Sequence, residues 1–66
     1  MTLEERVNIV VNVCEDEIKR MEVFMNIAEK REDDSEWLRY YDLRNLYEFV
    51  RDILNGKYDL EIENNR

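Results

Sequence analysis

Residues 7–28 read VNIVVNVCEDEIKRMEVFMNIA, and this stretch decides the fold of the chain. Its apolar residues recur in alternating steps of four and three, which is typical of a helix that buries one narrow stripe. The stripe consists of Val7, Val11, Cys14, Ile18, Met21, Met25 and Ala28. Because most of the stability of a helix in a protein comes from packing its apolar side, we expect this stripe to lie against a second element.

The ends of the helices are also marked in the sequence. Thr2 followed by Glu5 is a capping-box pattern, which satisfies backbone amides at the start of a helix. We therefore predict a first helix over about residues 2–31, an acidic loop over 32–35 and a second helix over about 35–54. Asn55 and Gly56 follow, and Gly56 is predicted to adopt the left-handed conformation that ends many helices.

The predicted fold class is all-α, an antiparallel hairpin of two long helices with a short extended C-terminal tail. The second helix carries its own apolar stripe of Leu43, Leu46, Val50 and Ile53. A chain of 66 residues with a single cysteine has a small core and no internal disulfide, so self-association is the expected source of extra stability. We predict a homodimer that forms a four-helix bundle, with a self-association seam made of Val7, Val11, Cys14, Ile18, Met21, Met25, Leu43, Leu46, Val50 and Ile53.

The tail, residues 57–66, has a different period. Tyr58, Leu60 and Ile62 alternate with acidic residues, which is typical of a strand. Such a segment either packs over the end of the hairpin or pairs as an edge with another chain, so these three residues are a possible partner contact.

The charge of the chain is −7, from 17 acidic and 10 basic residues. Residues 32–36 contribute four acids and no base. This charge disfavours direct binding to nucleic acid or to anionic membranes. No apolar run approaches the length of a membrane span, and the N-terminus has no hydrophobic leader, so we expect a cytoplasmic protein, or one in the host-cell cytoplasm if it is viral.

The residues that usually carry enzyme chemistry are scarce. The sequence has no histidine and only one glycine, which argues against common zinc sites and glycine-rich phosphate loops. Cys14 lies on the apolar stripe, and the consecutive acids Glu15, Asp16 and Glu17 point about 100° apart on a helix. We therefore expect no enzymatic activity, no cofactor and no metal.

Glu17 is the one acid that falls inside the apolar arc of the first helix. A carboxylate there needs a partner, and by height the first candidate is Arg51, with Arg39 as a candidate across a dimer. We expect a structural ion pair, with a recessed acid that receives a basic ligand group as the alternative.

The predicted partner-binding surface is a stripe on the second helix made of Trp37, Tyr41, Arg44 and Glu48. It lies roughly opposite the apolar stripe of that helix, so in a simple hairpin it would face water. Tryptophan, tyrosine and arginine dominate the energetics of protein interfaces. The alternatives are that these rings pack in a dimer or beneath the tail.

Taken together, these features indicate a small acidic helical module that binds a protein partner and regulates it by inhibition. Small accessory proteins of viruses and mobile elements often have this make-up. A first alternative is a mimic of nucleic acid that blocks a DNA- or RNA-binding host protein. A second is a structural or assembly subunit of a helical complex.

Overall fold

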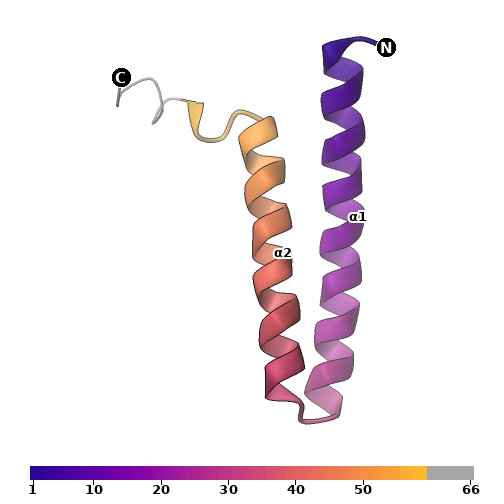
Figure 1. Ribbon diagram of the computed structural model, residues 1–66, viewed down its shortest axis with the longest axis vertical. Coiled ribbons are helices and arrows are strands. Elements are labelled where there is room, and N and C mark those ends of the chain that lie inside the picture. The colour runs from indigo at the N-terminus through magenta and orange to yellow at the C-terminus, as the bar shows by residue number, and fades with distance from the viewer. Residues whose placement is uncertain (60–66) are drawn as a thin grey trace.

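A computed structural model describes residues 1–59, and these residues form two α-helices. Helix α1 spans Leu3–Lys30 and helix α2 spans Asp34–Leu54. The helices lie side by side and antiparallel, joined by a short loop (Figure 1). The Cα atoms extend only 11 Å in the shortest direction, so the hairpin is a single layer with two broad faces. The predicted all-α antiparallel hairpin is confirmed.

Helix α1 begins and ends with recognisable caps. The Thr2 hydroxyl oxygen accepts a hydrogen bond from the Glu5 amide at 3.1 Å and donates to the Glu5 carboxylate at 3.2 Å. At the other end, the Asp33 amide donates to the Ala28 carbonyl at 2.9 Å and Glu32 is left-handed, with φ of 56°. This is a Schellman motif with glutamate at the position that favours glycine.

Asp33 joins the two helices. While its amide closes α1, its side-chain Oδ1 accepts a hydrogen bond from the Glu36 amide at 3.1 Å and so caps α2. An aspartate at this position satisfies one of the free amides of the helix start, and Glu36 stands three residues later as in a capping box. The turn between the helices is therefore held from both sides by one residue.

Helix α2 ends in a second Schellman motif. Gly56 has φ of 83°, as predicted, and the Lys57 amide donates to the Asp52 carbonyl at 3.0 Å. The chain then continues in a turn, and the Tyr58 ring packs 5.6 Å from the ring of Phe49. The prediction of an extended strand is therefore wrong at Tyr58, because the helix cap turns the chain back onto α2. Leu60 and Ile62 lie outside the described residues.

The core is formed by the predicted stripe of α1. Six of its residues are buried, Val7 is half-buried, and the thiol of Cys14 is enclosed with only 4% of the residue exposed. Helix α2 has no fully buried residue. The predicted packing stripe of α2 is wrong in part, because Leu46 is 55% exposed and Ile53 42% exposed, while Leu43 and Val50 are half-buried.

The reason lies in which side chains of α2 reach the stripe of α1. The half-buried positions of α2 include a set of long side chains: Trp37, Tyr40, Arg44, Tyr47 and Arg51. Aromatic rings and arginine stems bury large apolar areas while their polar ends stay near water. In a two-helix layer these side chains cover the narrow stripe, and the aliphatic residues of α2 lie on the flank.

Candidate protein-interaction site

Three of the predicted partner-binding residues, Trp37, Tyr41 and Arg44, form a stacked ladder along one side of α2. The rings of Trp37 and Tyr41 stack with centroids 5.1 Å apart and planes 13° apart, and the guanidinium carbon of Arg44 lies 5.2 Å from the Tyr41 ring centroid. These residues and Glu48 are half-buried, so the expectation that the stripe faces water is wrong. The ladder instead flanks the buried stripe of α1 and exposes only its outer edge.

Arg44 has an unusual environment. Its Nε atom is buried and has no hydrogen-bond partner among the described residues. Burial of a donor without a partner costs about 1–3 kcal/mol. The stacking on Tyr41 offsets part of this cost through cation–π attraction. The side chain is therefore held by packing more than by hydrogen bonds.

An acidic hollow lies beside the ladder, at the loop end of the hairpin. Its volume is about 380 Å³, and it is lined by Glu29, Glu32, Asp34 and Trp37. Three acidic residues thus line the same hollow as Trp37. The acidic loop was visible in the sequence, but its position beside Trp37 depends on how α2 is turned.

The carboxylates continue from this hollow along the same side of the hairpin. Glu29, Glu22 and Glu15 follow one another at seven-residue spacing on α1, and all three are exposed. On α2, Asp34, Tyr41 and Glu48 follow the same spacing. Residues seven apart on a helix lie nearly above one another. We call this surface the acidic face: Glu15, Glu22, Glu29, Glu32, Asp34, Trp37, Tyr41 and Glu48.

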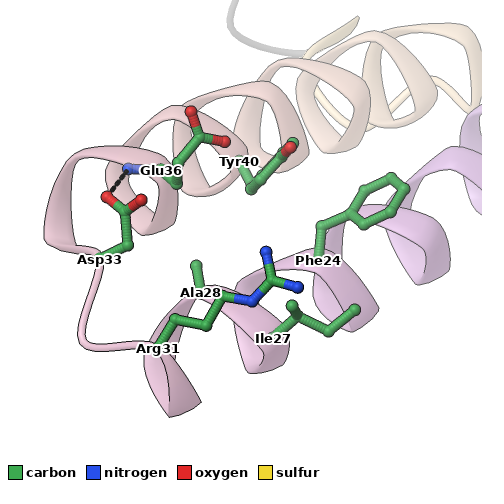
Figure 2. Close-up of a pocket in the computed structure, with 7 residues that line it drawn as sticks. All are labelled: Phe24, Ile27, Ala28, Arg31, Asp33, Glu36 and Tyr40. Carbon is green, nitrogen blue, oxygen red and sulfur yellow. Dashed lines mark hydrogen bonds between the residues drawn. The ribbon is translucent and has the colours of Figure 1, made fainter.

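A second hollow lies on the other side of the buried stripe and is lined by both apolar and charged residues (Figure 2). Phe24 and Tyr40 lie at one end of it, with ring centroids 5.1 Å apart. Its volume is about 300 Å³, and its lining consists of Phe24, Ile27, Ala28, Arg31, Asp33, Glu36 and Tyr40. None of these residues was predicted as a binding residue, because the sequence does not show which flanks of the two helices share a side.

The hollow shows which residues lie on the same broad face. Seven-residue steps back from Phe24 reach Glu17 and Val10, and steps back from Ile27 reach Arg20 and Val13. On α2, steps forward from Glu36 reach Leu43 and Val50, with Leu46 beside them. We call this surface the apolar face: Val10, Val13, Glu17, Arg20, Phe24, Ile27, Leu43, Leu46 and Val50.

The apolar face contains the ion pair of Glu17. Its carboxylate lies 3.2 Å from Arg20 of the same helix, and its side chain is 25% exposed. The predicted pairing with Arg51 is wrong, because Arg51 pairs with Asp52 at 3.2 Å. Arg39 lies 3.9 Å from Glu36 in its own helix. A neighbour one turn away holds the charge with less ordering of long side chains than a partner on the other helix.

The surroundings of Asp52 change the pKa of its carboxyl. Its desolvation raises the pKa, but hydrogen bonds from Lys57 and Arg51 and the charges of these two residues outweigh this, so the pKa lies below its usual value. The Lys57 ammonium is 3.3 Å away. This cluster ties the turn after α2 back to the helix.

Within residues 1–59, no group of three histidine, cysteine, aspartate or glutamate side chains comes together in a way that could hold a metal ion. Neither helix of the described chain is long and apolar enough to cross a membrane. Comparison of the chain with protein-family models, with curated proteins and with solved structures found no match in any of the three.

Proposed function

We propose that this protein is a small, non-enzymatic helical module that binds a protein partner through its acidic face and thereby inhibits it. The observation that carries the proposal is the placement of the Trp37–Tyr41–Arg44 ladder beside the carboxylates of Glu29 and Asp34. This arrangement offers an aromatic anchor and a negative field at one place.

The chemistry of this face selects a basic partner surface. A lysine or arginine side chain in the acidic hollow would meet the carboxylates and the edge of the Trp37 ring together. A cation over an indole contributes roughly 0.5–2 kcal/mol, and charge-assisted hydrogen bonds to carboxylates add to this. The row of Glu15, Glu22 and Glu29 extends the negative field along the helix and steers a basic surface toward it.

The chain would inhibit its partner by occupying the surface that the partner uses to bind another ligand. A partner surface rich in lysine and arginine serves in many proteins to bind an acidic or phosphorylated ligand, and a module seated on that surface excludes the ligand. Mimicry of nucleic acid is a special case of this mechanism. The spacing favours it less, because carboxylates seven residues apart recur at about 10.5 Å along the helix, whereas phosphates recur every 3.4 Å or so along one DNA strand.

The test begins with identification of the protein that the purified chain retains from an extract of its native host. Its affinity is then measured for the wild type and for the triple variant Glu15→Gln, Glu22→Gln and Glu29→Gln. We expect the triple variant to bind roughly tenfold or more weakly and with a smaller dependence on salt, because three charges that face the partner are lost.

A matched control removes the same number of charges elsewhere. Glu5→Gln, Asp16→Asn and Asp42→Asn alter exposed residues away from the acidic face, and glutamine keeps the capping-box pattern. This control should bind within a few-fold of the wild type. Equal losses in both triple variants would show that net charge alone drives binding, and the proposal would then be abandoned. If a nucleic acid that the partner binds competes with the wild-type chain for the partner, the chain acts as a mimic of nucleic acid.

A further inference from the structure

One flank of α1 carries a row of side chains that is complementary to itself when it is reversed. The row steps by three, four, three, four and three residues through Val10, Val13, Glu17, Arg20, Phe24 and Ile27. Two apolar residues stand at each end, and an acid and a base stand in the middle. The centre of the row falls between Ile18 and Lys19.

Such a row is complementary to a second copy of itself in the antiparallel direction. A two-fold axis through the centre of the row places each residue opposite its counterpart at the same distance on the other side. Glu17 then faces the partner's Arg20, and Val13 faces the partner's Phe24. In a parallel alignment, by contrast, Glu17 would face the partner's Glu17.

The exposure of these residues fits a covered surface. Val10, Val13 and Ile27 are 44%, 53% and 41% exposed, although all three are aliphatic. Glu17 and Arg20 already form a 3.2 Å ion pair in the single hairpin. Two such pairs across the axis form a ring of alternating charges, in which every acid has a base on both sides.

Helix α2 contributes an apolar residue at the level of the axis. The contact between Phe24 and Tyr40 sets the register of the antiparallel helices. Six residues before Phe24 stands Ile18, and six residues after Tyr40 stands Leu46. Because both helices rise equally per residue, Leu46 lies level with the centre of the row, and it is 55% exposed. The axis therefore passes close to Leu46 and the partner's Leu46.

At the ends of the row, like charges meet beside carboxylates. Arg6 lies four residues before Val10 and Arg31 four residues after Ile27, so the axis places the partner's Arg6 opposite Arg31 at the loop end of the apolar face. There the hollow of Figure 2 holds the carboxylates of Asp33 and Glu36 with the single cation of Arg31. The partner's Arg6 thus meets a site with an excess of one negative charge.

The size of the face is near what a dimer requires. Helices of 28 and 21 residues, each about 10 Å wide, present roughly 700 Å² on one side, against about 800 Å² per partner in a standard interface. The hairpin alone buries six apolar residues of α1 and none of α2. Small scaffolds of this kind commonly gain stability through oligomerisation.

We propose that a second copy of this chain covers the apolar face, with the two α1 helices antiparallel and with Glu17 and Arg20 paired to the partner's Arg20 and the partner's Glu17. Two hairpins then form a four-helix bundle, and the acidic face of each remains on the outside. The assembly does not depend on the identity of any other protein.

Charge reversal tests this register. The variants Glu17→Arg and Arg20→Glu each place four like charges at the axis, and we expect each to weaken the dimer roughly tenfold or more. An equimolar mixture of the two variants restores both crossed pairs, so it should form a mixed dimer as tight as the wild type. Sedimentation equilibrium measures the mass relative to the 8.2 kDa chain, and native mass spectrometry identifies the mixed species.

The mixture separates the contact between copies from effects within one helix, because mixing restores no interaction inside either chain. Glu15→Arg and Lys19→Glu serve as the matched control, since they reverse an acid and a base of α1 away from the apolar face. Both control variants should remain dimeric alone, with helicity unchanged by circular dichroism. A monomeric wild type at micromolar concentration, unaffected dimers of the reversed variants, or a mixture that stays monomeric would each overturn the proposal.

Discussion

The two broad faces of this hairpin are built from the same two helices, yet they differ in almost every physical property. One face is aliphatic, with a single ion pair between Glu17 and Arg20 at its middle. The other carries carboxylates at seven-residue spacing and an aromatic ladder at its edge. Residues seven apart on a helix lie almost above one another. When similar side chains recur at this spacing along α1, each face therefore has a uniform character.

This difference suggests a division of roles. Exposed apolar area on a small protein marks an interface, and in water an aliphatic surface gains most from another aliphatic surface. An array of carboxylates repels a second copy of itself and attracts a basic surface. The apolar face therefore suits self-association, and the acidic face suits a different protein.

The largest expected effect separates the buried stripe from the apolar face. Val11 is 9% exposed within the hairpin, and Leu46 is 55% exposed on the face proposed for the second copy. We expect Val11→Asp to unfold the hairpin, because a charge without a partner is buried, at a cost of about 3 kcal/mol or more. Leu46→Asp should leave a helical monomer and abolish the dimer.

Circular dichroism and sedimentation, measured together on both variants, check this pair of outcomes. Lys19→Glu, an exposed change of charge on α1 away from the apolar face, provides the control and should alter neither property. Unfolding of Leu46→Asp at every concentration would mean that Leu46 belongs to the core of the hairpin itself. The buried stripe of α1 and the apolar face would then belong to one core, and the apolar face would not be a separate surface for a second copy.

A smaller effect is expected in the ladder that borders the acidic face. Because Trp37 is half-buried and stacked on Tyr41, Trp37→Ala should lower the free energy of unfolding by about 2 kcal/mol. Arg44→Met should leave stability unchanged or slightly higher, since methionine keeps the packing volume and removes the buried Nε that has no hydrogen-bond partner.

Chemical denaturation of the two variants measures both changes. If Arg44→Met loses as much stability as Trp37→Ala, the guanidinium makes an interaction beyond its packing on Tyr41. Once a partner is in hand, Arg44→Met also becomes the cleaner probe of binding, because a change in affinity would not arise from unfolding.

The stripe of α1 could be read from the sequence because its steps of four and three are unbroken from Val7 to Ala28. The same rule failed for α2. Its leucines follow the helical period, but the aromatic and arginine residues follow the period equally well on an adjacent side. Sequence periodicity gives the direction of a stripe on its own helix, and only the packing decides which of two adjacent stripes faces inward.

The candidate site followed the same pattern. The sequence placed Trp37, Tyr41 and Arg44 together because residues four and three apart share one side of a helix, and their rings and guanidinium do stack. Their neighbours Glu29 and Glu32 come from the other helix and the loop, so no local pattern could group them with Trp37. Glu17 was recognised as unusual, but its partner proved to be the nearest base in its own helix.

The smallest effect concerns the loop, where one residue contributes both strain and charge to the acidic face. Glu32 has φ of 56°, a conformation that costs a residue with a side chain about 1 kcal/mol and suits glycine. Glu32→Gly should therefore raise the free energy of unfolding by up to about 1 kcal/mol, although glycine also adds freedom to the unfolded chain. Asp33→Asn and Asp34→Asn, which remove loop charge while asparagine still caps α2, should change stability little. Thermal denaturation of these variants separates strain from charge.

Affinity for the partner then shows whether the negative field comes from the loop or from the row on α1. If Glu32→Gly binds within a few-fold of the wild type while neutralising Glu15, Glu22 and Glu29 weakens binding, the helical row is the interacting surface. A steep loss of affinity in the loop variants alone would move the site to the end of the hairpin.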